Sequence, residues 1–201
     1  MKVIIVTEIP LSSHRVFAER RSFLRRSGRA VLSAAAITVL AGKGLFAEDY
    51  KDGGNAASDA RILNNILGGE FEAVAAYQVG AESGLLHKPV LALAKQFQGQ
   101  HKEHAALIAA TVNALGGKPV EPKKIAEYKF PVETLKTQED IVRFAAGLEM
   151  GAVSAYLSAV RPLGDRGLAT TAASILADEA MHLAILRQVL GENPAPKPFV
   201  A

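Results

Sequence analysis

The sequence predicts an all-α protein built as a four-helix bundle, with one long crossover between its second and third helices. From about residue 57 onward, apolar side chains recur every three or four residues in four segments, which is the spacing of one face of an α-helix. No segment alternates apolar and polar residues over a useful length, as a half-buried strand would. Two of the links between segments are short turns and the third has about twenty residues, as in a bundle with a crossover.

The composition fits one medium-sized domain with an additional N-terminal segment. The chain has 201 residues, of which 49% are hydrophobic, and a formal net charge of +3. Residues 1–47 carry eight Lys or Arg and two Asp or Glu, whereas the rest of the chain carries 15 and 18. Because this body is mildly acidic, a nucleic-acid partner is not expected. The absence of cysteine excludes disulfides, thiolate metal sites and iron–sulfur clusters.

The N-terminal segment contains a motif that resembles the twin-arginine export signal. Arg20 and Arg21 are followed by Phe23 and Leu24, in the order that this signal uses. Glu19 stands where the signal usually has Ser or Thr. The motif predicts that the twin-arginine export machinery is a partner of the chain.

A short apolar run after the motif fits the same interpretation. Residues 30–41 are weakly apolar and too few to cross roughly 30 Å of hydrocarbon as a helix. Leu45-Phe46-Ala47 offers a cleavage site before Glu48. We therefore predict that residues 1–47 are a twin-arginine-type signal peptide, that the mature protein has no permanent membrane span, and that it resides in the bacterial periplasm or cell envelope. The alternatives are an uncleaved membrane anchor and a basic amphipathic arm.

The first predicted helical hairpin follows a polar linker at residues 48–56. A helix is expected from about residue 57 to 83, with Glu70 on the same stripe as apolar residues. Pro89 suits the first turn of a second helix. His101 and His104 lie on the inner face of that helix, which ends at two consecutive glycines.

The second hairpin follows a crossover at residues 118–136 that contains three prolines and no helical period. Thr137 is a predicted N-cap, and the helix after it carries Glu149 on its apolar stripe. The fourth helix carries Glu179 and His182, one turn apart, and runs to about residue 190. An extended link of twenty residues reaches roughly 66 Å, which exceeds the roughly 38 Å of a 25-residue helix. The second and third helices are therefore expected to be parallel within a bundle at residues 57–191, followed by a C-terminal tail at 192–201.

The two hairpins repeat each other in sequence. The first and third helices share the pattern Glu-x-x-Ala-Val-x-Ala-Tyr, which begins at Glu70 and at Glu149 and ends at Tyr77 and at Tyr156. His101-x-x-His104 and Glu179-x-x-His182 occupy matching places in the second and fourth helices, 78 residues apart. Chance similarity between alanine-rich helices would match apolar positions, not core-facing Glu, His and Tyr.

With this repeat, the chain from about Ser58 to Leu190 resembles the ferritin-like superfamily, and more closely its exported ferritin-like domain proteins. The superfamily pattern takes one Glu from each of the first and third helices and Glu-x-x-His from each of the second and fourth. The matching positions here are Glu70, His101, His104, Glu149, Glu179 and His182. The resemblance implies two metal ions at these residues, iron or manganese, and leaves a homo-oligomer open.

One residue departs from the superfamily pattern, because His101 stands where a Glu commonly bridges the two metals. A neutral imidazole offers one lone pair, so it cannot bridge as a carboxylate does. The site loses one negative charge, which leaves room for zinc or for a single ion. His101 is either a ligand or a hydrogen-bonded core histidine. Tyr77 and Tyr156 are either hydrogen-bond donors to the ligands, redox-active phenols or packing residues.

These features predict an exported metal-binding protein with a redox or metal-handling role. An enzymatic version would be a metal-dependent oxidoreductase, such as an oxidase or a peroxide-consuming enzyme. The alternative is a metal-free or structural-metal bundle that binds a partner protein, since bundles host unrelated functions.

Overall fold

The computed structural model describes residues 55–199, which fold into an all-α unit without β-strands in that range. Its long helices are α2 (Ala56–Glu82), α3 (Lys88–Ala114), α4 (Gln138–Val160) and α5 (Arg166–Val189). The predicted four-helix fold class is thus confirmed. The predicted signal peptide, the predicted export motif and most of the predicted linker lie outside the described residues. None of the described helices is long and apolar enough to cross a membrane.

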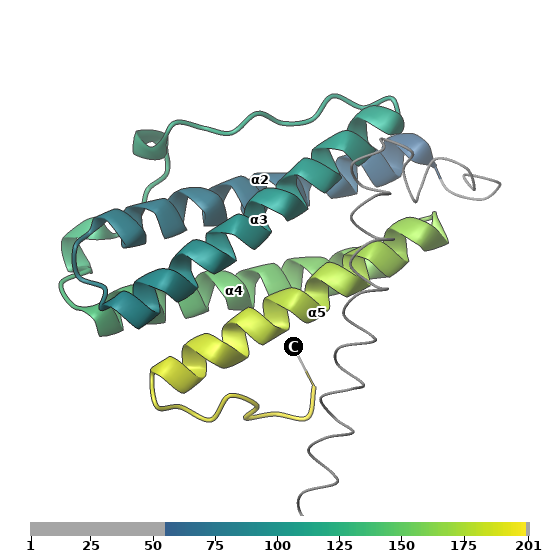
Figure 1. The fold of residues 1–201 in the computed structure, drawn as a ribbon. Helices are drawn as coiled ribbons and strands as arrows, with labels where there is room; N and C mark the ends of the chain where they lie inside the picture. Colours follow the sequence, from purple (N-terminus) through teal and green to yellow (C-terminus); the bar gives the residue numbers. More distant parts are fainter. Residues whose placement is uncertain (1–54, 200–201) are drawn as a thin grey trace, which may run out of the picture. The chain divides into compact units, whose positions relative to one another are not determined.

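The four helices form two antiparallel hairpins, α2 with α3 and α4 with α5, and α2 also packs against α4. The crossover between α3 and α4 runs along the length of the bundle, so that these two helices point the same way (Figure 1). This is the parallel arrangement expected from the length of the crossover.

The helices begin and end where local chemistry favours it. The side chains of Asn55, Thr137 and Asp165 accept backbone N–H groups in the first turns of α2, α4 and α5. Helix α3 has no such cap but has a proline in its first turn. Gly116, which follows α3, adopts a φ of +76°, a conformation that residues with a Cβ rarely reach.

A buried aspartate fixes the second hairpin onto the first. Asp59 on α2 is only 1% exposed, and its two carboxylate oxygens accept the N–H groups of Gly164 and Asp165 at 2.9 and 3.1 Å. These contacts hold the α4–α5 turn against the start of α2 and satisfy the buried carboxylate.

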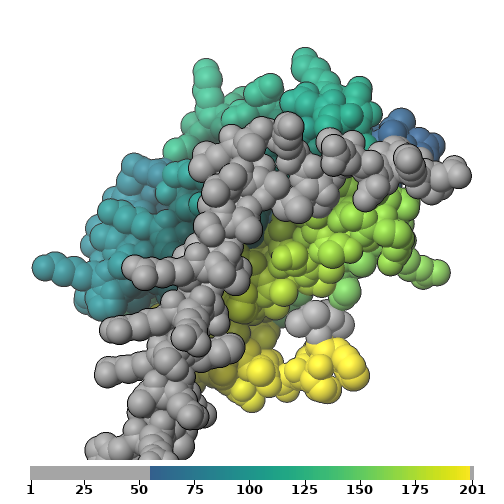
Figure 2. All heavy atoms as spheres, turned by 45° about the vertical axis from the view of Figure 1, so that its right-hand side comes forward, coloured from purple at the N-terminus to yellow at the C-terminus, as the bar shows by residue number. Residues whose placement is uncertain are grey.

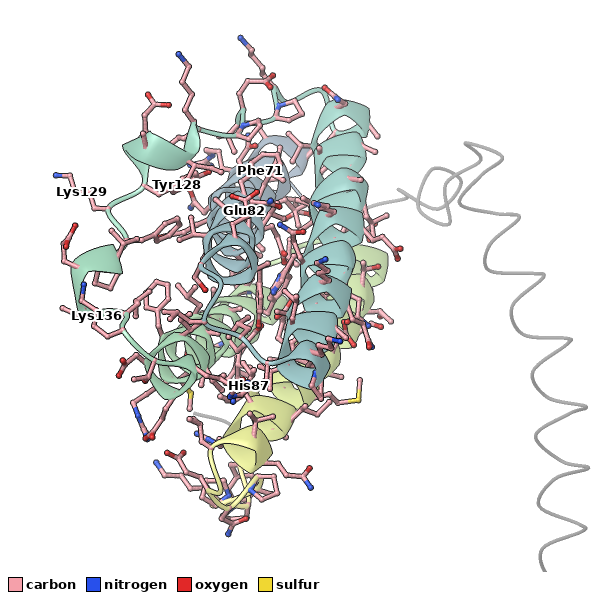
Figure 3. All side chains as sticks on the ribbon, turned by 60° about the vertical axis from the view of Figure 1, so that its left-hand side comes forward. Phe71, Glu82, His87, Tyr128, Lys129 and Lys136 are labelled. Carbon is pink, nitrogen blue, oxygen red and sulfur yellow. The ribbon has the colours of Figure 1, made fainter. Side chains whose placement is uncertain are left out.

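The crossover is held to the helices by side-chain contacts. Asn64 on α2 donates to the carbonyl of Lys118 and accepts the N–H of Val120, at 2.8 and 2.9 Å. Phe130 packs edge-on against Phe144 of α4. The segment also contains two short 3₁₀ helices, η1 (Ile125–Glu127) and η2 (Val132–Thr134), that its sequence did not predict. Lys129 and Lys136 extend outward from this connection (Figure 3).

The core consists of two apolar clusters. One is built around Leu67, Val112 and Tyr156, and the other around Tyr77, Phe97 and Val142. Buried charged residues from all four helices lie on the same inner faces. The tail at residues 192–199 is exposed beyond the end of α5 (Figure 2).

Candidate metal centre

The structure brings together all six side chains that the sequence predicts as metal ligands. Helix α2 contributes Glu70, α3 contributes His101 and His104, α4 contributes Glu149, and α5 contributes Glu179 and His182. The side chain of His104 is 13% exposed and the others are 2% exposed or less. Each lies on an apolar helix face, so the helical period that buries the neighbouring Ile and Leu residues also buries these polar groups.

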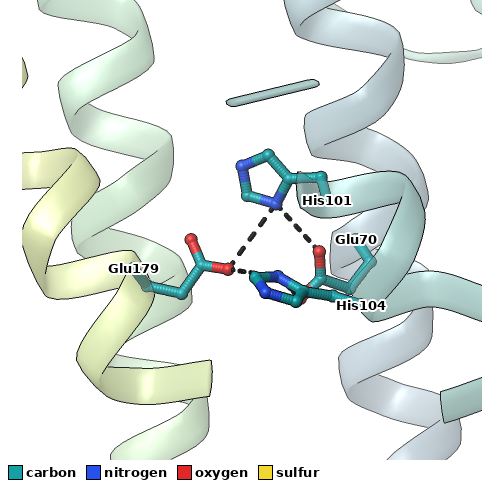
Figure 4. A group of neighbouring side chains, drawn as sticks. All are labelled: Glu70, His101, His104 and Glu179. Atoms are coloured by element: carbon teal, nitrogen blue, oxygen red, sulfur yellow. Dashed lines mark hydrogen bonds and ion pairs between the residues drawn. The ribbon is translucent and has the colours of Figure 1, made fainter. Parts of the chain in front are cut away.

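The centre has two halves, which match the two hairpins of the repeat. In the first half, His101 Nδ1 lies 2.8 Å from Glu70 Oε2 and 3.6 Å from Glu179 Oε1 (Figure 4). His104 Nδ1 is 3.0 Å from Glu179 Oε1, without the alignment of a hydrogen bond. Glu70, His101, His104 and Glu179 thus offer four ligand atoms within 4.8 Å of one another.

The second half is centred on His182. Its Nδ1 lies 3.5 Å from Glu149 Oε2 and 3.4 Å from Glu179 Oε2. His101 Nε2 reaches this half as well, 3.3 Å from Glu149 Oε1. His101, Glu149, Glu179 and His182 form a second group of four ligand atoms within 4.8 Å. Glu179 therefore directs one oxygen to each half, and His101 directs one nitrogen to each.

Several buried atoms of the centre have no hydrogen-bond partner. They are His104 Nδ1, Glu149 Oε2, both carboxylate oxygens of Glu179, and His182 Nδ1. An unsatisfied buried donor or acceptor costs about 1–3 kcal/mol, and more for a charged group. Imidazole nitrogen and carboxylate oxygen atoms are the kinds of atoms that bind divalent transition metal ions. The residues present therefore fit the metal that the sequence pattern implies.

The charges of the centre favour protonated imidazoles when no metal is bound. Burial alone lowers the pKa of His101, but its contacts with Glu149 and Glu70 raise the pKa to about 10. In the same way, burial lowers the pKa of His104 and of His182, while their carboxylate neighbours outweigh it and bring each pKa to about 9. A metal ion that binds these imidazoles must displace protons.

The carboxylates differ in their surroundings. Burial raises the pKa of Glu70, but contacts with His101 and His104 outweigh it and lower the pKa overall. Burial likewise raises the pKa of Glu149, and His101 and His182 reverse this. The pKa of Glu179 stays above its ordinary value because burial dominates there.

The two repeated tyrosines are hydrogen-bond donors to the carboxylates. The hydroxyl of Tyr77 donates to Glu149 Oε1, and that of Tyr156 donates to Glu70 Oε1. Burial and the adjacent carboxylates raise the pKa of both phenols, which keeps the hydroxyls protonated. This is the first of the roles that the sequence left open for them, and each tyrosine crosses from one hairpin to the other.

Two residues near the centre were missed by the sequence prediction. Asp178 Oδ2 lies 3.4 Å from the Nε2 atoms of both His104 and His182. Gln100 Oε1 lies 3.0 Å from His182 Nε2. These contacts fix the two rings so that each Nδ1 is directed toward Glu179. The signal was present in the sequence, because Asp178 precedes His182 by one helical turn and Gln100 occupies the matching place in α3.

Other charged residues of these helices lie at the surface. Glu72 on α2 and Glu103 on α3 are exposed. His87 is exposed at the α2–α3 turn, away from the centre (Figure 3).

A cavity of about 210 Å³ between α2 and α4 reaches the first half of the centre. Glu70, His101 and Tyr156 line it together with small residues of both helices, among them Gly69 and Gly151. The small side chains of these residues leave space beside Glu70 and His101.

The comparisons with known proteins agree with this architecture. The family described as ferritin-like domain matches residues 58–192. No curated protein matches the chain. A crystal structure of a conserved hypothetical protein from Mycobacterium tuberculosis is similar in fold, with a TM-score of 0.61 and 20% identity over 73% of this chain and 98% of that one.

A second similar crystal structure is described as ferritin-like, diiron-carboxylate proteins from Bacillus anthracis str. Ames. Its TM-score is 0.56, and its identity is 18% over 67% of this chain and 96% of that chain. At such identities the likeness shows the fold alone. The family match, in contrast, covers more than half of the chain and nearly all of the bundle, and this chain belongs to the ferritin-like domain family.

Proposed function

We propose that this chain is an exported metal-binding protein that holds iron or manganese at the Glu and His centre and uses it in redox chemistry or metal handling. The observation that carries the proposal is the set of five buried nitrogen and oxygen atoms without hydrogen-bond partners. They occur among three carboxylates and three imidazoles inside a ferritin-like bundle. The Bacillus anthracis neighbour, described as diiron-carboxylate, supports the choice of metal.

The side chains of the centre divide the work of holding a metal. Glu149, Glu179, His104 and His182 offer the unpartnered donor atoms. Tyr77 fixes one oxygen of Glu149 and leaves the other free to bind. When bound, iron or manganese would supply electron exchange with a small oxidant. The cavity beside Glu70 would admit such a molecule while the apolar clusters on the inner helix faces exclude bulk water.

The metal part of the proposal is tested by thermal melting of metal-free protein with Fe(II), Mn(II) and Zn(II) added in turn. A metal at 100 times its dissociation constant stabilises the fold by roughly 2.7 kcal/mol, which raises the Tm by several degrees. Glu103→Ala is a suitable control because this carboxylate is exposed on α3, next to His104 in sequence. If no metal raises the Tm of the wild type, the partner-binding bundle becomes the better interpretation.

The export part of the proposal depends on Arg20 and Arg21, which precede the apolar run of the predicted signal peptide. Replacing both by Lys keeps their charge and removes the guanidinium pair that the twin-arginine machinery recognises. We expect this double variant to remain unexported, as measured by its distribution between cytoplasmic and exported fractions. Unchanged export would refute the twin-arginine route, and an uncleaved product at the membrane would favour the anchor.

A further inference from the structure

The two halves of the centre are related by the sequence repeat, yet their atoms are not equally free to bind a metal. We infer that the centre holds one metal ion, bound by Glu149, Glu179 and His182, and that a hydrogen-bonded pair of Glu70 and His101 takes the place of a second ion. This inference rests on the proposed function, since it specifies how many metals the centre binds and where.

In the first half, only His104 Nδ1 and Glu179 Oε1 lack a hydrogen-bond partner, and the other atoms that a metal would need are already paired. Glu70 Oε1 accepts the hydroxyl of Tyr156, and Glu70 Oε2 lies 2.8 Å from His101 Nδ1. The other nitrogen of His101 faces Glu149 Oε1 at 3.3 Å. Both oxygens of Glu70 and both nitrogens of His101 therefore have partners. A metal bound by this pair would have to break a buried hydrogen bond that it would not replace.

In the second half, three donor atoms from two helices have no hydrogen-bond partner. They are Glu149 Oε2, Glu179 Oε2 and His182 Nδ1. The nitrogen lies 3.5 Å from the first oxygen and 3.4 Å from the second. Ligands at 2.0–2.1 Å from a tetrahedral ion are about 3.4 Å apart. Both separations fit those between the corners of one tetrahedral site.

The charge of the centre also favours a single metal ion. Its three buried carboxylates carry three negative charges, and the more exposed Asp178 lies at its edge. Two divalent ions would leave an excess of one positive charge in a buried space, where an unbalanced charge is costly. Both nitrogens of His101 face carboxylate oxygens, which only accept, so this ring is an imidazolium, and together with one divalent ion it balances the three negative charges. A fourth buried carboxylate would balance two ions, and the repeat shows where it is missing, because His101 matches Glu179.

His101 therefore determines how many ions the centre can hold. Glu179 directs one oxygen toward each half, in the orientation of a bridging carboxylate. His101 also directs one nitrogen toward each half, but each nitrogen is paired with a carboxylate oxygen, Nδ1 with Glu70 and Nε2 with Glu149. At this position of the repeat, α5 therefore has a metal ligand, Glu179, whereas α3 has His101, which pairs with carboxylates.

The test is the number of metal ions bound per full-length chain. The metal-free protein is titrated with Zn(II) by calorimetry, and bound zinc is measured by elemental analysis after gel filtration. We expect one tightly bound equivalent for the wild type and two for His101→Glu, which restores the fourth carboxylate. His101→Gln is the matched control, since it removes the imidazole without adding a charge, and it should bind one equivalent.

The position of the ion is tested with the repeat-related pair Glu149→Gln and Glu70→Gln, whose helical content is checked by circular dichroism. Glu149→Gln should lose the tight equivalent and Glu70→Gln should keep it. Two equivalents in the wild type would overturn the inference, as would loss of the ion in Glu70→Gln but not in Glu149→Gln. A wild type that binds no zinc, iron or manganese would instead refute the proposed function itself.

Discussion

The hairpins α2–α3 and α4–α5 differ at two positions of an otherwise shared pattern. Each supplies a Glu, a Tyr whose hydroxyl contacts the Glu of the other hairpin, and a His whose Nδ1 faces the centre. Where α5 has Asp178 and Glu179, α3 has Gln100 and His101.

These two differences change the chemistry of the centre but not the arrangement of the helices. The helices keep their positions, and the polar residues stay on the buried faces. Replacing a carboxylate by an imidazole changes which atoms are paired, because an imidazolium donates where a carboxylate accepts. One exchange at a repeated position can therefore leave a fold intact and change what its centre binds.

The largest expected effect comes from truncating the two repeat-related residues themselves. Glu179→Ala removes two unpartnered oxygens that face both halves, so it should abolish the metal-dependent stabilisation of roughly 2.7 kcal/mol and the rise in Tm that results from it. His101→Ala should retain most of that rise. The measurement is a thermal melt with and without Zn(II), with helical content checked by circular dichroism. Equal responses of the two variants would show that the halves contribute alike.

A second effect concerns pH in the metal-free protein. Carboxylate contacts outweigh burial and raise the pKa of His101 to about 10 and that of His182 to about 9, above the value of about 6.5 expected in the unfolded chain. A pKa raised on folding contributes stability that is complete below about pH 6.5 and is lost as the pH rises through the folded value. The Tm of the metal-free protein should therefore fall by several degrees between about pH 6.5 and pH 10.

Metal should reverse this trend, because it binds neutral imidazoles and releases protons. The difference in Tm between the zinc-bound and metal-free forms should grow over the same pH range. The His182→Gln variant of the metal-free protein should show a shallower decline than the wild type. A metal-free Tm that rises toward pH 10 would contradict the assignment of protonated imidazoles.

A smaller effect is expected from the residues that orient the histidine rings. Asp178 contacts the Nε2 atoms of both His104 and His182, whereas Gln100 contacts only that of His182. Asp178→Asn should weaken zinc affinity about tenfold, and Gln100→Ala should weaken it less. Calorimetric titration at constant pH measures both. A larger loss of zinc affinity for Gln100→Ala than for Asp178→Asn would contradict this prediction.

Much of the centre could be predicted from the sequence because helical periodicity is a local property. Glu70, Glu149, Glu179 and His182 fall on apolar stripes, and a charged group on such a stripe must be compensated. The fold class followed from the same periodicity and from the length of the crossover. The two 3₁₀ turns of the crossover could not be predicted, because such short turns have no repeating sequence pattern.

The pairing of atoms could not be predicted, because it depends on how side chains from different helices meet. From the sequence, His101 could be either a ligand or a hydrogen-bonded histidine. Only the structure shows that its two nitrogens lie next to Glu70 and Glu149. The contacts of Tyr77 and Tyr156 with the opposite hairpin could not be predicted from the sequence either. The predicted export signal lies outside the described residues and stays a prediction.

The smallest expected effect tests whether the asymmetry extends to the tyrosines. Tyr77 holds Glu149, a proposed ligand, while Tyr156 holds Glu70, which is paired with His101. Removing one hydroxyl loses a hydrogen bond whose net contribution is about 0.6 kcal/mol at the low end, equivalent to roughly threefold in affinity. Tyr77→Phe should therefore weaken zinc binding about threefold, whereas Tyr156→Phe should leave it within error, although both lose a similar hydrogen bond. Both variants remove a single buried oxygen, so their metal-free melting temperatures control for general destabilisation. If Tyr156→Phe weakened zinc binding as much as Tyr77→Phe, Glu70 would be a ligand equal to Glu149, and the two halves of the centre would be equivalent after all.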